Sequence, residues 1–354
     1  MRVLVAMSGG VDSSVAAALL RAAGHEVVGA TMKLWGGASD SGCCSVADVA
    51  DARRVADRLE IAHHTFDFTE SFTERVVDRY VAEHRAGRTP NPCVECNRHL
   101  KFDKLLGRAL RLGFDAVATG HHARVVRAGD GRARLYRGRD AAKDQSYVLA
   151  VLGPEQLART LLPVGEHTKA EVRALAKRLG LPTADKPESQ EVCFIARRGT
   201  DAGRAAFLGA RFALHPGRVL DAASGAALGR VPAVELVTVG QRRGLGVAAA
   251  PGARRYALAV DVERKEVLVG DEAALSTDFF ALEHLRSTGE PLRVGMAVLA
   301  QTSAHGRCHP GVLAEGGVVL DAPARRVAPG QLVALYRGDQ VLGSATAGAW
   351  PRHG

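Results

Sequence analysis

The segment that most constrains the fold joins an apolar strand to a helix near the start of the chain. Residues 2–7 form an apolar, β-branched run and residues 12–23 have helical spacing; between them stands Met7-Ser8-Gly9-Gly10-Val11-Asp12-Ser13-Ser14. Glycines let a backbone approach a phosphate, and a helix N-terminus supplies N–H donors. The loop lacks both the Gly-Lys-Ser/Thr ending of a Walker A loop and the dinucleotide Gly-x-Gly-x-x-Gly. We therefore expect a phosphate loop of another kind, in which a divalent cation bridges Asp12 to the phosphates; the alternative is a tight turn with Asp12 as helix cap.

Strands and helices alternate through the first half of the chain. We expect strands at 2–7, 26–32, 64–68 and 115–119, with a hairpin at 124–136, and helices at 12–23, 46–59, 69–83, 102–112, 144–152 and 168–179. The last helix opens with Thr168-Lys169-Ala170-Glu171, a capping-box pattern. This alternation predicts an α/β fold with a doubly wound parallel sheet covered on both faces.

After about residue 200 the pattern changes to short β-rich segments. They are separated by Gly, Pro and Asp, and include 218–220, 257–260, 266–269, 297–300, 317–320 and 332–336. Short strands with such turn residues are typical of small barrels or sandwiches. We expect one or two β modules to follow the α/β domain.

The charge of the chain hints at an anionic partner. It carries 47 Lys and Arg against 38 Asp and Glu, a net charge of +9. However, 39 of the 47 basic residues are Arg, which is also typical of a composition-biased genome. The excess is concentrated, however: residues 101–200 hold 19 basic and 11 acidic side chains, mostly basic at 101–139. The absence of a signal pattern at Met1 and of a long apolar run argues against secretion and membrane spanning, so we expect a cytoplasmic protein.

Six cysteines are too few for a disulfide scaffold and indicate reduced thiols. Cys93 and Cys96 form a Cys-x-x-Cys, whose spacing suits zinc, an iron–sulfur cluster or a dithiol. The plain alternative is a set of buried apolar residues. We expect Cys96 to stand just before a helix, where the helix dipole and a neighbouring Lys or Arg favour its thiolate. The others are Cys43, Cys44, Cys193 and Cys308.

Six motifs in order carry a resemblance to a known family. They are Ser-Gly-Gly-Val-Asp-Ser-Ser, Thr-Pro-Asn-Pro-x-x-x-Cys-Asn, Gly-His-His-Ala at 120–123, Lys-Asp-Gln-Ser-Tyr at 143–147, Ser-Gln-Glu-Val-Cys-Phe-Ile at 189–195 and Thr-Val-Gly-Gln-Arg-Arg-Gly at 238–244. Together they make the chain, from Met1 to about Ala347, resemble the tRNA-specific 2-thiouridylases, the MnmA family of the pyrophosphatase-loop superfamily. The resemblance implies a catalytic pyrophosphatase-loop domain at 1–200, a small central β-rich domain at 201–275 and a tRNA-binding β-barrel at 276–354.

The resemblance also implies the reaction. ATP with Mg²⁺ would adenylate O2 of the wobble uridine of a tRNA and release pyrophosphate. A persulfide on Cys193 would then deliver sulfur and displace AMP, leaving Cys96 and Cys193 as a disulfide. The implied partners are tRNA, whose backbone would lie across 101–139, and a sulfur donor such as a cysteine desulfurase or a relay protein. No permanently bound cofactor and no metal site of the protein's own are expected.

Residue roles follow position by position from the resemblance. The nucleophile would be Cys96 and the persulfide carrier Cys193, with Asp12 also catalytic. The ATP site would comprise Ala6, Met7, Ser8, Gly9, Gly10, Val11, Asp12, Ser13, Met32 and Gly120. The tRNA contacts would be Asn91, Pro92, Cys93, His121, Lys143, Asp144, Gln145, Ser303, Ala304 and Gln331.

Some alternatives stay open. His121 can equally be interpreted as a hydrogen-bonded histidine at the end of a strand. Lys143 and Asp144 can be interpreted as the solvated start of a helix. Ser303-Ala304 departs from the family's Arg–aromatic pair and supplies neither charge nor stacking. The segment 184–195 has no clear periodicity and is expected to be a mobile loop that closes over the site and excludes water.

Three other hypotheses concern the function. An iron–sulfur cluster held by Cys93, Cys96 and Cys193 would give the same tRNA thiolation by another route. A pyrophosphatase-loop synthetase acting on a small molecule would need neither Cys96 nor Cys193. A basic RNA-binding protein with a vestigial nucleotide pocket would release no AMP.

Overall fold

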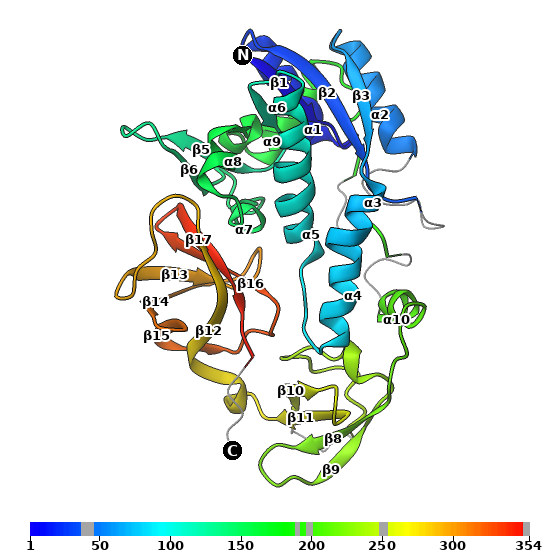
Figure 1. Ribbon diagram of the computed structural model, residues 1–354, viewed down its shortest axis with the longest axis vertical. Helices are drawn as coiled ribbons and strands as arrows, with labels where there is room; N and C mark the ends of the chain where they lie inside the picture. The colour runs from blue at the N-terminus through cyan, green and yellow to red at the C-terminus, as the bar shows by residue number, and fades with distance from the viewer. Residues whose placement is uncertain (37–45, 188–191, 196–200, 248–253, 350–354) are drawn as a thin grey trace.

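The computed structural model describes residues 1–36, 46–187, 192–195, 201–247 and 254–349. Its N-terminal part is a five-stranded parallel sheet in the order β3-β2-β1-β4-β7. Strands β1, β2 and β3 are labelled in Figure 1. The strands are β1 (Arg2–Ala6), β2 (Glu26–Lys33), β3 (His63–Asp67), β4 (Ala116–Ala118) and β7 (Thr160–Leu161). The predicted doubly wound parallel sheet is confirmed.

Helices cover both faces of this sheet because alternate residues of each strand point to opposite sides. Val3 and Val5 of β1 lie in a core with α1 (Val11–Ala22), α2 (Val46–Arg58) and α9 (Lys169–Arg178). Leu4 and Ala6 lie in a second core cluster on the opposite face. The helices on that face are α3 (Thr69–Phe72), η1 (Thr73–Val77), α4 (Asp78–Arg85), η2 (Cys96–Leu105), α6 (Leu106–Arg111) and α10 (Asp201–Gly209).

Short helical segments complete the chain. They are α5 (Pro92–Glu95), α7 (Ser146–Leu149), α8 (Pro154–Ala158), η3 (Pro163–Glu166), η4 (Val234–Leu236) and η5 (Ala273–Leu275). The helix expected at 144–152 is therefore only one turn long. The helix expected at 102–112 begins ten residues earlier, at Pro92, and runs through η2 and α6.

The central module is a four-stranded sheet in the order β10-β11-β8-β9. Its strands are β8 (Gly217–Asp221), β9 (Ala227–Val231), β10 (Tyr256–Asp261) and β11 (Glu266–Gly270), and only the β8–β11 pair is parallel. It has a small core of its own around Val219, Val234 and Val267.

The C-terminal module is a closed antiparallel barrel of six strands. The strand order is β12-β15-β14-β13-β16-β17, and β12 also pairs with β17, which closes the ring. The strands are β12 (Ser276–Ser287), β13 (Ala297–Gln301), β14 (Cys308–Ala314), β15 (Gly317–Arg325), β16 (Leu332–Arg337) and β17 (Gln340–Ala347). The predicted barrel is confirmed.

A hairpin from the first half of the chain extends the barrel sheet. The predicted hairpin is formed by β5 (Ala123–Arg127) and β6 (Ala133–Arg137), and β6 pairs with β17 at Tyr136 and Gln340. The hairpin stands out from the body of the molecule beside the barrel (Figure 1). Within the described residues, no helix is long and apolar enough to cross a bilayer.

Candidate active site

The phosphate loop leaves β1 and enters α1 at the carboxyl edge of the parallel sheet. Gly9 has φ 71°, and a Cβ there would stand 2.3 Å from the carbonyl oxygen of Asp48, so only glycine fits. Ser13 Oγ accepts a hydrogen bond from the Ser8 N–H at 3.2 Å and donates one to the Gly10 carbonyl at 3.1 Å. These bonds hold the loop as a cradle at the N-terminus of α1, which is an anion-binding arrangement.

Two further residues of the predicted ATP site lie on neighbouring strands. Gly120 follows β4, and a Cβ there would stand 2.5 Å from the Ser13 nitrogen, so this close approach requires glycine. Met32 lies in β2 and is buried in the same core cluster as Ala6. The structure thus places the predicted ATP-binding residues on three adjacent strands at one edge of the sheet.

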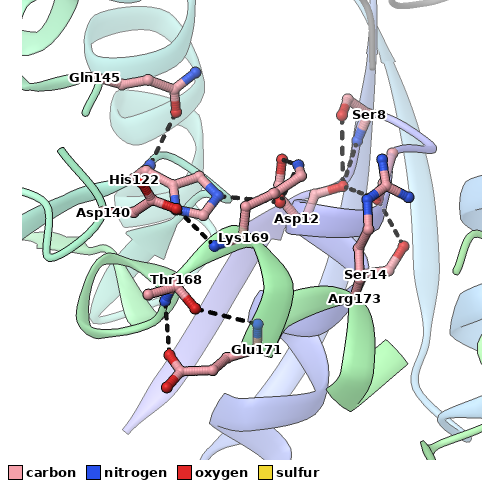
Figure 2. Close-up of polar contacts among 12 residues, drawn as sticks. Ser8, Asp12, Ser14, His122, Asp140, Gln145, Thr168, Lys169, Glu171 and Arg173 are labelled. Carbon is pink, nitrogen blue, oxygen red and sulfur yellow. Dashed lines mark hydrogen bonds and ion pairs between the residues drawn. The ribbon is translucent and has the colours of Figure 1, made fainter. Parts of the chain in front are cut away.

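Asp12 is the charged centre of this edge (Figure 2). Lys169 Nζ donates to both carboxylate oxygens at 2.7 Å, and His122 Nε2 lies 3.2 Å from Oδ1. Burial acts to raise the pKa of the Asp12 carboxyl, but hydrogen bonds from His122 and Lys169 and their charges hold that pKa below its ordinary value. Asp12 is therefore an anion at neutral pH.

The Lys-Asp-Gln motif at 143–145 lies directly beside this centre. Gln145 Oε1 accepts from the His122 N–H at 2.9 Å, and the Gln145 N–H donates to the His122 carbonyl at 2.8 Å. Gln145 is exposed and Lys143 is half-buried. A side chain expected to contact tRNA is thus bonded to the residue that contacts Asp12.

Asp144 occupies a different environment from its two neighbours. It is 4% exposed, and its oxygens accept from the Gly138 N–H, from the Ser146 N–H and hydroxyl, and from Arg137 Nη1 at 2.7 to 3.1 Å. The alternative of a solvated helix start is wrong for Asp144, because these donors fold the loop around its carboxylate.

His121 is buried behind the site. Its Nδ1 lies 2.7 Å from Thr119 Oγ1 and its Nε2 lies 3.4 Å from Lys101 Nζ. Burial and the positive charge of Lys101 keep the pKa of His121 well below its ordinary value, so the ring is neutral.

The Cys-x-x-Cys lies at the start of a helix. Asn91 caps α5 by accepting from the Cys93 and Val94 N–H groups at 3.1 and 3.4 Å, and Pro92 is the first helical residue. The expectation that Cys96 precedes the helix is therefore wrong: the cap and the proline start the helix one turn earlier. Cys93 is exposed and Cys96 is half-buried.

Cys193 is held by its neighbour Phe194. Phe194 is 1% exposed and belongs to an aromatic cluster with Trp35, Phe72, Tyr80 and Phe207. Cys96 and Cys193 both pack against the core cluster that contains Ala6 and Met32. The two predicted catalytic thiols, although about a hundred residues apart, adjoin the same core.

The segment before Cys193 is tied to the phosphate loop. Thr183 Oγ1 donates to Ser14 Oγ at 2.9 Å, and Arg173 Nη1 donates to the Ala184 carbonyl at 2.9 Å. Lys186 Nζ lies 2.6 Å from Asp48 Oδ1. The middle of the loop expected at 184–195, residues 188–191, and also Cys43 and Cys44 lie outside the described residues.

The barrel reaches the nucleophile segment through one residue of the predicted tRNA site. Gln331 Nε2 donates to the Thr89 carbonyl at 2.6 Å, just before Asn91. Ser303 and Ala304 lie in a turn whose carbonyls accept from Gln301 Nε2 at 2.8 and 3.0 Å. The structure therefore brings Gln331 to the nucleophile segment, and Ala304 packs against the core cluster that contains Val94 and Tyr147.

Sequence reasoning missed two features of the site. The first is Lys169; its only indication in the sequence is its place in the capping-box pattern at 168–171. The second is a pocket beside the nucleophile segment, between α4, α5 and the barrel, whose charged lining includes Arg79, Arg88, Arg98 and Glu95. Burial acts to raise the pKa of Glu95, but His99, Arg98 and Arg79 hold it below its ordinary value.

A phosphate loop at the carboxyl edge of a parallel sheet, with two thiols packed against the core cluster on one face of that sheet, is the arrangement of a nucleotide-using enzyme of the pyrophosphatase-loop class. Comparison with known proteins gives the family. Residues 1–197 match the model described as the tRNA methyl transferase HUP domain, 205–271 the tRNA methyl transferase PRC-barrel domain and 301–347 the Aminomethyltransferase beta-barrel domain.

Curated relatives match over nearly the whole chain. Proteins named tRNA-specific 2-thiouridylase MnmA from Chloroflexus aurantiacus, Mycobacteroides abscessus and Kineococcus radiotolerans are 44%, 47% and 49% identical. Each alignment covers 98% of this chain and 97%, 99% and 98% of the relative. The chain belongs to the tRNA-specific 2-thiouridylase family. Among solved structures, the U34-tRNA thiolase NcsA from Methanococcus maripaludis matches with 18% identity over 59% of this chain and 65% of that one, at a TM-score of 0.36.

Proposed function

We propose that the protein is an ATP-dependent tRNA sulfurtransferase that replaces O2 of the wobble uridine with sulfur. The observation that carries the proposal is that Cys96 and Cys193 both pack against one core cluster, which also contains Ala6 and Met32 of the predicted ATP site. The names of the curated relatives support the same activity.

In the first step the uridine O2 forms a bond to the α-phosphorus of ATP. The bond from that phosphorus to the bridging oxygen breaks, and pyrophosphate leaves with the electron pair. The cradle of N–H groups at the start of α1 binds the phosphates. Asp12 offers the carboxylate oxygen that the Mg²⁺ accompanying ATP prefers as a ligand. O2 thereby becomes part of AMP, which is a good leaving group.

In the second step a persulfide on Cys193 delivers its outer sulfur to C2 and AMP leaves. The thiolate of Cys96 attacks the inner sulfur, so the sulfur–sulfur bond breaks toward the product and a Cys96–Cys193 disulfide forms. A thiol reductant then restores both cysteines, and a cysteine desulfurase or a relay protein reloads Cys193.

The tRNA lies across the basic hairpin and the edge that carries Lys143 and Gln145. Arg127 and Arg132 are exposed on the hairpin, where they can contact phosphates. Asn91, which lines the arginine-rich pocket, lies beside the extruded uridine, and Pro92 follows it in sequence. The Asp144 carboxylate accepts four hydrogen bonds, so Asp144 acts by fixing the loop that carries Lys143 and Gln145.

Mass spectrometry of tRNA incubated with ATP, Mg²⁺, cysteine, a cysteine desulfurase and a thiol reductant tests this proposal. Wild-type protein yields 2-thiouridine together with AMP and pyrophosphate. Cys96→Ser and Cys193→Ser abolish 2-thiouridine, whereas Cys308→Ser, in the barrel, retains it. If either of the first two variants keeps full activity, that cysteine does not have the proposed role.

The same preparations separate the alternatives. A visible absorption band with near-stoichiometric iron after anaerobic purification, lost with activity in Cys93→Ser, would favour an iron–sulfur route. Release of AMP and pyrophosphate without 2-thiouridine, unchanged in Cys96→Ser and Cys193→Ser, would favour a small-molecule synthetase. S-adenosylmethionine in place of ATP serves as a control, because all three matched domain models have methyltransferase names.

A further inference from the structure

The arginine-lined pocket beside the nucleophile segment is built from three parts of the chain. Helix α4 contributes Arg79, and the segment that runs through α5 into η2 contributes Asn91 and Arg98. The barrel contributes His284 and Leu332. Asn91 is expected to lie beside the target uridine, so the pocket adjoins the place where that base would be held. None of the six sequence motifs includes Arg79 or Arg98.

One arginine of the pocket is neutralised within the protein. Arg88 Nε donates to Glu83 Oε2 at 2.8 Å, and its Nη2 donates to Glu283 Oε2 at 2.9 Å. These bonds join the end of α4 to strand β12 of the barrel. Arg88 therefore holds two parts of the structure together and has little charge to offer a ligand.

The other two arginines share a single carboxylate. Arg79 Nη1 lies 3.2 Å from Glu95 Oε2, whereas Arg98 Nη1 lies 3.7 Å from Oε1, which is beyond hydrogen-bond distance. His99 Nε2 also lies 3.2 Å from Oε2. Because one negative charge faces two guanidinium groups, this cluster keeps a net positive charge.

Arg98 is the least satisfied member of the cluster. Its side chain is 17% exposed, and its buried Nε has no hydrogen-bond partner among the described residues. Burial acts to lower the pKa of Arg98, Glu95 opposes this, and the charges of Arg286 and Arg79 lower the pKa further. An arginine stays protonated even so. The protein thus holds a largely buried cation with an unused donor, an arrangement that an anion would stabilise.

The barrel adds basic residues to the pocket at an irregular point in β12. His284 has φ 56°, in the left-handed region that few residues other than glycine adopt, and the pairing of β12 with β17 shifts register between Glu283 and Arg286. Bulges of this kind re-aim side chains. Here His284 lines the pocket, and Arg286 is close enough for its charge to act on Arg98.

We propose that this pocket is a phosphate-binding subsite, in which Arg79 and Arg98 hold the phosphodiester that joins the target uridine to a neighbouring anticodon nucleotide. The planar guanidinium group can donate to two oxygens of one phosphate, which an ammonium cannot do in the same way. Extrusion rotates a nucleotide about its backbone, so the flanking phosphates stay beside the base that enters the site. Binding one of them positions the uridine for the thiols. This inference rests on the proposed function.

Modified RNA tests the inference on the wild-type protein. The probe is an anticodon stem-loop RNA in which an uncharged methylphosphonate replaces one of the two linkages that flank the target uridine. We expect one of these two replacements to weaken binding, measured by fluorescence anisotropy, about tenfold. The same replacement within the stem should weaken it by less than about twofold. Equal effects at all three positions, or no effect at any, would overturn the inference.

Variants test which residues hold the phosphate. Arg98→Gln and Arg79→Gln are each expected to weaken binding of the unmodified RNA about tenfold. They should have little further effect on the RNA whose critical linkage is already uncharged, because protein and RNA changes remove the same contact. Arg111→Gln is the control, since Arg111 ends α6 just before β4, at the amino edge of the sheet. Fully additive losses would show that the two arginines do not hold this phosphate.

The binding measurements need neither ATP nor a sulfur source, so the two proposals can fail separately. In turnover, Arg98→Gln should lower kcat/KM for tRNA and leave the KM for ATP unchanged; an equal loss for both substrates would overturn the subsite. Normal coupling to the uncharged linkage without any 2-thiouridine from the wild type would refute the proposed function alone. Formation of 2-thiouridine without that coupling would refute the subsite alone.

Discussion

Lys169 and Asp12 form a close ion pair in which Nζ lies 2.7 Å from both carboxylate oxygens. The two residues are distant in sequence and belong to different helices, α9 and α1. Their pairing joins the end of the parallel sheet where nucleotide is expected to the segment that leads on to Cys193.

Removing either partner of this pair takes away a close opposite charge from a largely buried charged group. We expect Asp12→Asn and Lys169→Met each to destabilise the fold, and the double variant to lose less than their sum. The coupling free energy is expected to be about 1–3 kcal/mol by urea unfolding. The exposed pair Lys177–Asp185 is the control and should couple by less than about 0.5 kcal/mol. Equal coupling in both pairs would contradict the prediction.

Gly120 is expected to be required for nucleotide binding. In Gly120→Ala the new Cβ meets the Ser13 nitrogen at 2.5 Å and the Asp12 carbonyl carbon at 2.6 Å, so the phosphate loop must move. We expect ATP binding, measured by calorimetry, to weaken by about tenfold or more. Gly129→Ala, where a Cβ has nothing within 4 Å, should bind ATP as the wild type does. Unchanged binding by Gly120→Ala would show that the loop does not approach Gly120 so closely in solution.

Arg137 joins the hairpin to the barrel. Its guanidinium donates to Asp144 at 3.0 Å and Gln301 at 2.7 Å, and lies 3.9 Å from the centre of the Tyr336 ring. Lysine cannot reproduce this planar set of contacts, so Arg137→Lys is expected to lower the free energy of unfolding by about 1–3 kcal/mol.

Arg134→Lys is the matched control, because Arg134 lies on the same strand and pairs with Asp130 at the surface. Thermal melting followed by circular dichroism measures both variants. A decrease in Tm of the same size in both would mean that the Arg137 contacts add nothing beyond surface pairing.

Stability is expected to fall in mild acid because of His84. Burial, with the positive charge of Arg204, lowers the pKa of His84 to about 4, although a bond to the Glu235 carbonyl opposes the shift. The unfolded chain binds this proton at about pH 6.5 and the folded chain only near pH 4, so stability is lost as pH falls through that window. Between pH 7.5 and 5 this group accounts for about 2 kcal/mol.

Comparison of unfolding at those two pH values checks the prediction. His84→Gln removes the titration and should show a smaller loss of stability on acidification than the wild type. The exposed residue His305 serves as the control, and His305→Gln should behave as the wild type. If His84→Gln retains the full wild-type dependence, other groups are responsible for it.

The hairpin is expected to account for part of the salt dependence of tRNA binding. Replacing both Arg127 and Arg132 by Gln should make the slope of log K against log salt less steep by about 1–2. Each phosphate contact that is lost lowers the number of counterions released on binding by about one. Filter binding over a series of KCl concentrations measures the slope. Lys177→Gln with Arg178→Gln, on α9, should leave it unchanged, and an equal reduction would place the tRNA elsewhere.

Much of the fold could be predicted because its signals are local. The strand-to-helix junction at Gly9 and Gly10, the capping box of α9 and the alternation of strands and helices depend on backbone preferences of neighbouring residues. The start of the Cys96 helix was missed, although Asn91 and Pro92 form a cap and first turn that the sequence displays. Prolines are also typical of loops, and Pro90 and Pro92 therefore led to the prediction of a loop at this position.

The sequence by itself determined the phosphate-loop motif, the parallel sheet and the β-rich second half, because each depends on short-range pattern; the barrel was implied by the family resemblance. Only the tertiary structure decided that Lys169 faces Asp12, that Asp144 is buried under Arg137 and that a hairpin from the first half extends the barrel sheet. The first and the last of these pairings join residues that are far apart in the chain. Nothing in local propensity selects one distant partner over another; the packing of α9 on α1 and of β6 on β17 does.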